Sequence, residues 1–116
     1  MNKPKKILII EHDDFLREII GNLLHKKGGF ILNGISIDQG ISESRKHRIN
    51  TVILGTSAAG YQGKKTIGYL KKHLENPGLQ VYIINHSDGK IDFIDPKDQF
   101  DINTFSVSDI ISAVDV

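Results

Sequence analysis

Three short apolar runs constrain what this chain can fold into more than any other feature of its sequence. The runs are ILII at 7–10, TVIL at 51–54 and VYII at 81–84, and each is rich in β-branched residues. A strand with one face in water would alternate apolar and polar residues, so largely continuous apolar runs indicate strands covered on both faces. Such strands are typical of a parallel sheet that lies between two layers of helices.

Helical patterns connect these strands. The clearest covers 15–24, where apolar residues recur at helical spacing; Asp13 or Asp14 is the expected N-cap, and the glycines at 28 and 29 end the helix. Further helices are expected at 37–47, where Gly40 lowers the helix propensity, at 64–74 and at 106–114. Two more strands are expected at 30–35 (FILNGI) and 99–102 (QFDI). The alternation predicts an α/β fold of three layers with right-handed crossovers.

Composition limits the other possibilities. At 116 residues, with 39% hydrophobic and 25% charged residues, the chain is expected to form a single domain. The net charge is +1 and the Lys and Arg residues are spread along the sequence, so we expect no binding to nucleic acid or to an acidic membrane. The chain has no cysteine, which excludes disulfides and Cys-based zinc sites. No segment has the apolar length of a signal peptide or a membrane span, so the expected location is the cytoplasm.

Four segments, taken in order and spacing, resemble the receiver domain of two-component response regulators. They are ILIIEHDDFLRE, TVILGTSAAGYQG, VYIINH and QFDINTFSVSDII, and with Gly60, Gly63 and Phe105 they extend the resemblance over essentially the whole chain. The resemblance implies a flavodoxin-like, CheY-like (βα)5 fold, with a central parallel sheet of five strands in the order 2-1-3-4-5. The segment for the family's fourth helix is shorter than usual, so that helix is expected to be shortened or irregular.

The phosphorylation signature of the receiver family is missing from this sequence. In a receiver, two acidic residues that hold Mg²⁺ follow the first strand, and the aspartate that accepts phosphate ends the third. Ser or Thr ends the fourth strand, and Lys-Pro follows the fifth. The corresponding positions, together with the neighbouring acid at 13 and the aromatic position of the conformational switch, are Glu11, His12, Asp13, Gly55, Asn85, Asn103, Thr104 and Phe100. This placement puts the fifth strand at 99–102; a rival placement puts it at IDFI (91–94), and neither restores the lysine.

These differences predict that phosphorylation is lost. Gly55 has no nucleophile, and Glu11 with His12 offers too few hard oxygen ligands for Mg²⁺, so we expect a cavity without a phosphoacceptor, metal or cofactor. Structural interpretations of the same residues are also open. Glu11 and Asp13 suit a helix start, Gly55 suits a close approach of backbone, and Asn85 and Asn103 suit the capping of loop backbone.

Two alternatives would keep a ligand at this edge of the sheet. AAGYQGKKT resembles a phosphate-binding P-loop, so Lys64 at the start of a helix could hold an anion or a nucleotide. Ala58 and Lys65 break that motif, and no later strand ends in an acid, so an enzyme is not expected. His12 and His86, beside Glu11 and Asp13, would suit Zn²⁺ better than Mg²⁺. A third alternative moves the phosphate to another acceptor, for which the candidates are Thr56, Ser57 and Asp13.

The function predicted from these observations is that of a pseudo-receiver, which acts by protein–protein interaction without a phosphorylation cycle. The expected partner is another protein, an attached output domain or a second copy of the chain. Receivers signal through the face made by helix four, strand five and helix five, where Phe100, Phe105 and Ile110 are expected to support the contact surface. The last helix has no polar stop before Val116, which is compatible with a domain that forms the N-terminal part of a longer chain.

Overall fold

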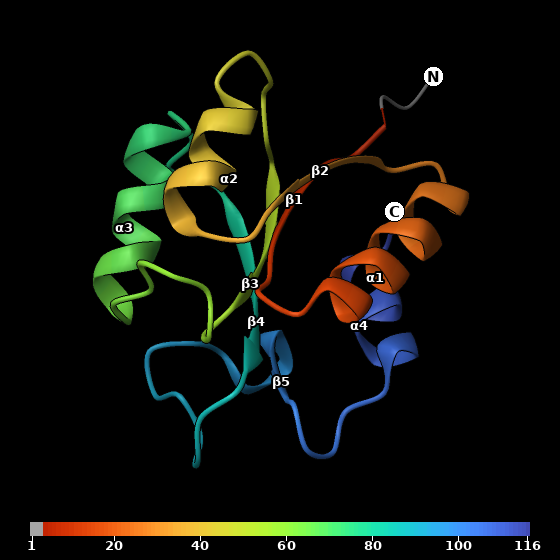
Figure 1. Ribbon diagram of the computed structural model, residues 1–116, viewed down its shortest axis with the longest axis vertical. Coiled ribbons are helices and arrows are strands. Elements are labelled where there is room, and N and C mark those ends of the chain that lie inside the picture. The colour runs from red at the N-terminus through yellow and green to blue at the C-terminus, as the bar shows by residue number, and fades with distance from the viewer. Residues whose placement is uncertain (1–3) are drawn as a thin grey trace.

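The computed structural model describes residues 4–116, in which strands and helices alternate (Figure 1). The strands are β1 (Lys6–Ile10), β2 (Phe30–Gly34), β3 (Thr51–Gly55), β4 (Gln80–Asn85) and β5 (Gln99–Asp101). The helices are α1 (Asp14–Lys26), α2 (Ile37–Ser44), α3 (Lys64–His73) and α4 (Val107–Val114), and a single 3-10 turn, η1 (Pro96–Asp98), precedes β5. Within residues 4–116, no helix has the length and apolar character needed to cross a membrane.

All neighbouring strands in the sheet are parallel, and their order is β2-β1-β3-β4-β5, as predicted. The fifth strand pairs with β4 through Ile83 opposite Gln99 and Asn85 opposite Asp101. This register places the fifth strand at the QFDI segment and excludes the rival placement at 91–94. The strand ends one residue earlier than predicted, because Ile102 begins a turn.

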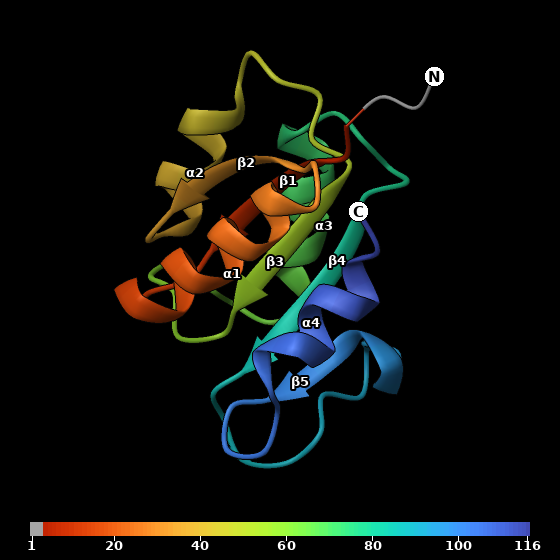
Figure 2. The same ribbon diagram turned by 90° about the vertical axis from the view of Figure 1, so that its right-hand side faces the viewer.

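The sheet separates two hydrophobic clusters, which explains why its strands are apolar at consecutive positions. In Figures 1 and 2, α2 and α3 cover one face of the sheet, and α1 and α4 cover the other. Along β1, Leu8 and Ile10 pack with the first pair of helices, whereas Ile7 and Ile9 pack with the second. All four side chains are fully buried. The αβα layering inferred from the three apolar runs is therefore confirmed.

The helix boundaries follow their local signals with one exception. Asp13 is the N-cap of α1 and accepts a hydrogen bond from the backbone N–H of Leu16. Helix α2 ends at Ser44, three residues before the predicted end at 47. It ends there because the next buried apolar residue is Ile49, which leads into β3 instead of extending the apolar stripe of the helix.

The segment between β4 and β5 contains no α-helix, in agreement with the predicted shortened or irregular fourth helix. Gln99 holds this segment as a loop: its side-chain oxygen accepts from the N–H of Ile91, and its amide nitrogen donates to the carbonyls of Ile91 and Ile94. The side chains of Ile91 and Ile94 pack against the cluster under α2 and α3. A loop therefore covers the part of the sheet that a helix covers in receivers.

Gly40 is required for the close approach of α2 to the sheet. A Cβ atom at Gly34 would lie 2.6 Å from the backbone nitrogen of Gly40, and one at Gly40 would lie 2.8 Å from the side chain of Ile10. The glycine that lowers the helix propensity of this segment thus allows the helix to pack directly on β1 and β2. A glycine in a helix costs about 1 kcal/mol relative to alanine, and the packing offsets that cost.

Two glycine-to-alanine substitutions are expected to change stability in opposite directions. Gly68 lies in α3, is exposed and has open space around it, so Gly68→Ala should raise the free energy of unfolding by about 0.5–1 kcal/mol. Gly40→Ala should lower it by about 1–2 kcal/mol, because the added methyl group overlaps Ile10. Urea denaturation of both variants tests this, and a gain in stability from Gly40→Ala would contradict the packing argument.

Candidate functional site

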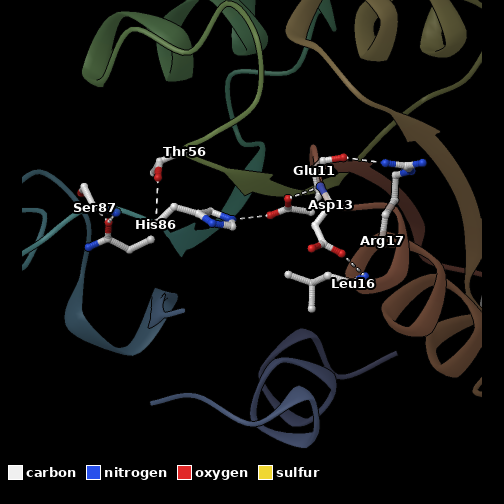
Figure 3. Close-up of polar contacts among 8 residues, drawn as sticks. Glu11, Asp13, Leu16, Arg17, Thr56, His86 and Ser87 are labelled. Atoms are coloured by element: carbon white, nitrogen blue, oxygen red, sulfur yellow. Dashed lines mark hydrogen bonds and ion pairs between the residues drawn. The ribbon is translucent and has the colours of Figure 1, made fainter. Parts of the chain in front are cut away.

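Polar side chains meet where β1, β3 and β4 end, at the carboxyl edge of the sheet. Glu11 follows β1, Thr56 follows β3 and His86 follows β4 (Figure 3). In an open parallel sheet this edge is the usual place for a ligand site, because the loops that leave the strands converge there. The three residues are joined to one another by hydrogen bonds, and they define the candidate site.

The carboxylate of Glu11 lies at the centre of this site. Glu11 is fully buried, and its two oxygens have different partners: Oε2 accepts from the backbone N–H of Asp13 at 2.8 Å, and Oε1 lies 2.7 Å from Nε2 of His86. The backbone carbonyl of Glu11 accepts from the guanidinium of Arg17 at 2.7 Å. Both carboxylate oxygens are therefore satisfied inside the protein. Of the two residues interpreted as helix-start acids, only Asp13 has that role.

The place beside Gly55 is filled by the Glu11 side chain. A Cβ atom at Gly55 would overlap Oε1 of Glu11 and would lie 2.9 Å from its Cδ. Any side chain at position 55, including the aspartate of a phosphorylatable receiver, would compete with Glu11 for the same space. The expected cavity beside position 55 is therefore occupied by a carboxylate from the residue after β1. Gly55 allows a close approach, but of a side chain and not of the backbone that its structural interpretation named.

His86 connects the ends of three strands. Its side chain is 22% exposed and reaches the carboxylate of Glu11, while its backbone N–H donates to the hydroxyl oxygen of Thr56 at 2.9 Å. The backbone N–H of Thr56 donates in turn to the carbonyl of Ile84 in β4. Sequence reasoning considered His86 only as a zinc ligand. The signal that could have found its role is the pairing of a strand-end acid with a strand-end histidine on the same sheet edge.

Asn85 and Asn103, at the hydroxyl and lysine positions of a receiver, have different surroundings. Asn85 is buried; its Oδ1 accepts from the N–H and the hydroxyl of Ser87, and its Nδ2 donates to the carbonyl of Gly89. All its polar groups are thus used to hold the loop that leaves β4. Asn103 is exposed, in the turn after β5, and its backbone N–H donates to the carboxylate of Asp101. His12 is exposed as well, so the side chains at positions 11, 12, 85 and 103 do not form one pocket.

Comparison with known proteins gives matches among solved structures alone, since no protein family and no curated protein sequence matches this chain. The chemotaxis protein CheY4 of Vibrio cholerae matches with a TM-score of 0.75 over 97% of each chain, at 9% identity. A DNA-binding response regulator of the LuxR family from Staphylococcus aureus matches with a TM-score of 0.72 over 95% of each chain, at 19% identity. A CheY-like response regulator receiver domain protein from Methanospirillum hungatei JF-1 matches with a TM-score of 0.65 over 75% of this chain and 68% of that chain, at 15% identity. The chain has the receiver-domain fold.

The donor set of this receiver fold does not fit the magnesium ion that receivers use. Mg²⁺ prefers near-octahedral coordination by oxygen ligands such as carboxylates. Here both oxygens of Glu11 are engaged with Asp13 and His86, Gly55 supplies no side-chain oxygen, and the carboxylate of Asp13 caps α1. For zinc, residues 4–116 contain no group of three or more His, Asp or Glu side chains placed to hold an ion. His12 and His86 are therefore not brought into one ligand set.

The loop after β3 resembles a P-loop in sequence, but its polar groups form hydrogen bonds with one another. The hydroxyl oxygen of Thr66 accepts from the backbone N–H of Gln62 at 2.6 Å, and the N–H of Tyr61 donates to the carbonyl of Ala58. Gly60 and Gly63 have positive φ values of 93° and 66°, which glycine adopts without strain. In a P-loop the backbone N–H groups point at phosphate, whereas here two of them are paired within the loop.

The residues expected to support an interaction face lie on the α1/α4 side of the sheet. Phe100 and Phe105 are partly buried against the cluster that contains Ile110, and Ile110 itself is fully buried. These side chains fix α4 against β5 and leave the outer surface of the face to other residues. In this receiver fold, the remaining part of the face is the loop at 86–98.

Proposed function

We propose that this chain is a pseudo-receiver, a domain of signal transduction that acts through protein–protein interaction and without phosphorylation. The observation that carries the proposal is the position of the Glu11 carboxylate, which takes the space beside Gly55. Catalysis of phosphoryl transfer in receivers consists of positioning and charge neutralisation around an aspartate. An internally paired carboxylate at this place competes for the space that an acceptor side chain at position 55 would need.

The groups that would transmit phosphorylation are also engaged in other contacts. Asn85 holds its own loop through Ser87 and Gly89, so its side chain is not free to approach a phosphoryl group. Thr56 is held between Ile84 and His86 by hydrogen bonds. These contacts tie the ends of β3 and β4 together without any ligand. The proposal is therefore that the domain has one fixed conformation instead of two that alternate.

The contact surface proposed for a partner is the face made by the loop at 86–98, β5 and α4. In place of a helix this face has a loop anchored by Gln99, so its shape differs from that of a phosphorylatable receiver. The proposed partner is another protein, an attached output domain or a second copy of this chain. A rigid, altered face is what a domain needs when its role is to dock and not to switch.

Incubation with a small phosphodonor and Mg²⁺ is expected to leave the intact mass of the protein unchanged. The physical reason is that position 55 has no nucleophile and the Glu11 carboxylate is buried and paired. Mass spectrometry under native and denaturing conditions measures the result, with a receiver that has a normal pocket as the positive control. Addition of one phosphoryl group to this chain would reject the proposal, and peptide mapping would then test Thr56, Ser57 and Asp13 as acceptors.

A further inference from the structure

A concave site lies at the opposite end of the molecule from Glu11 and His86. It is a cavity of about 650 Å³ between the loop that joins α2 to β3 and the turn that follows α3. Both segments lie at the amino edge of the sheet, at the top of Figure 1. This volume is in the range of small-molecule binding sites, which are typically about 300–1,000 Å³.

The cavity is lined by a run of three cationic side chains and by a histidine from each of its two walls. Arg45, Lys46 and Arg48 line it from one segment, and the imidazoles of His47 and His73 line it from both. Glu75 is the one carboxylate among its lining residues. The ion pairs found within residues 4–116 are Arg17 with Asp14 and His86 with Glu11, so the cations of this cavity have no carboxylate partner in the described chain. The cations come from one short run of the sequence, RKHR at 45–48, and the turn after α3 forms the facing wall.

The walls of the cavity are held in place before any ligand binds. Asn76 donates from its side chain to the carbonyl of Ile49 at 3.0 Å and accepts from the N–H of Gly78, which ties the turn to the loop. Each histidine contacts an aromatic ring in a tilted arrangement: His47 lies against Phe30, with ring centroids 5.1 Å apart, and His73 against Tyr69, at 4.1 Å. The backbone of the walls is thus held in place, which lowers the entropy lost on binding, whereas the side chains of Arg45, Lys46 and Arg48 are exposed.

Glu75 adds a second sign that this turn is constrained. Its φ value is 53°, in the left-handed region that residues other than glycine seldom adopt. Glycine usually occupies this position after a helix, and a residue with a side chain there stores a small strain energy. The strained position contributes a side chain to the cavity wall.

We propose that this cavity binds a ligand with two or more adjacent phosphoryl groups. An arginine guanidinium group can donate two parallel hydrogen bonds to the oxygens of one phosphate, and a lysine ammonium group adds a positive charge. The three cations carry more positive charge than the roughly −2 of one phosphate group can neutralise, which favours a polyphosphate group. The chemistry is shared by soluble polyphosphates and by phosphorylated lipid headgroups. This proposal is independent of the pseudo-receiver function, because it concerns the other edge of the sheet.

The test is a titration of the ¹⁵N-labelled protein with tripolyphosphate at physiological ionic strength, followed by amide chemical shifts. We expect saturable shifts centred on residues 44–49 and 73–76. The double substitution Arg45→Gln with Arg48→Gln should weaken binding by about tenfold or more. The matched control, Lys64→Gln with Lys65→Gln, removes the same number of charges at the start of α3 and should leave affinity within about twofold. All four side chains are exposed, so both variants should keep the wild-type spectrum elsewhere.

Several outcomes would overturn the proposal. Shifts centred on residues 60–65 would place the anion at the P-loop-like segment instead. An equal loss of affinity in both double variants would indicate attraction by net charge alone, and an absence of saturable shifts would exclude binding. A parallel experiment tests binding to vesicles that contain a phosphoinositide. If the protein binds both these vesicles and tripolyphosphate, a lipid headgroup is one source of the ligand. If it binds vesicles or an oligonucleotide but does not bind tripolyphosphate, the polyphosphate pocket is contradicted.

Discussion

Gly55→Asp, which places an aspartate where the resemblance to receivers puts the phosphoacceptor, is expected to destabilise this domain by about 3 kcal/mol. The new Cβ would overlap Oε1 of Glu11, and the new carboxylate would be forced into a buried place that already holds one. Since small domains are stable by only about 5–15 kcal/mol, the loss would be a large share of the total. In an ordinary receiver, an aspartate at this position is compatible with the fold.

Urea denaturation measures this effect, and the chain provides a matched control. Gly68→Asp introduces the same side chain at an exposed glycine with open space around it, and it should change stability by less than about 1 kcal/mol. The double variant Glu11→Ala with Gly55→Asp should be more stable than Gly55→Asp alone. Removal of the Glu11 side chain frees the space beside position 55 and lets the new carboxylate approach His86. Equal midpoints for Gly55→Asp and Gly68→Asp would contradict the assigned role of Glu11.

Glu11→Ala alone is expected to destabilise the domain by about 2–3 kcal/mol. It removes the acceptor of the Asp13 N–H and of His86 Nε2, and it leaves a small cavity beside Gly55. The connection between the ends of β1 and β4 would be lost with it. Glu11→Gln keeps the shape and one acceptor oxygen, so it should cost about 1 kcal/mol, less than the alanine variant.

The control for the Glu11→Ala variant is a substitution in the exposed ion pair between Asp14 and Arg17. Asp14 is 80% exposed in its side chain, so Asp14→Ala should cost less than about 1 kcal/mol even though it also removes a charge from the first turn of α1. Denaturation curves with equal slopes give the differences directly. If the midpoints of Glu11→Ala and Asp14→Ala coincide, the buried carboxylate has no structural importance and the description of the site is wrong.

The fold was predictable from the sequence because its signals are local and repeated. The strands at 7–10, 51–54 and 81–84 are apolar on both faces, and this pattern has few explanations besides a sheet between two helical layers. Asp13 or Asp14 marked the start of α1, and Asp13 is its N-cap. The shortened segment before β5 indicated the missing helix, although Gln99, which holds the loop, gave no signal because its partners are backbone groups eight and five residues away.

The candidate site was only partly predictable, because its central contact joins residues far apart in the chain. Sequence patterns showed that Gly55 lacks a nucleophile, but they did not show that Glu11 fills the same space. That conclusion needs the side-chain direction at the end of β1, which depends on the pairing of Glu11 with His86, 75 residues later. Gly40 is a similar case, because its use depends on how closely α2 approaches β2.

The way in which Glu11 and Gly55 share one space makes a change at either position dependent on the residue at the other. A lineage that regained an aspartate at position 55 first would carry an unstable intermediate, and one that lost the acid at position 11 first would carry a weakened sheet edge. Either single change is expected to lower stability, so the two positions are expected to be coupled. A designer who wished to restore phosphoryl chemistry to this scaffold would need to exchange both residues in a single step.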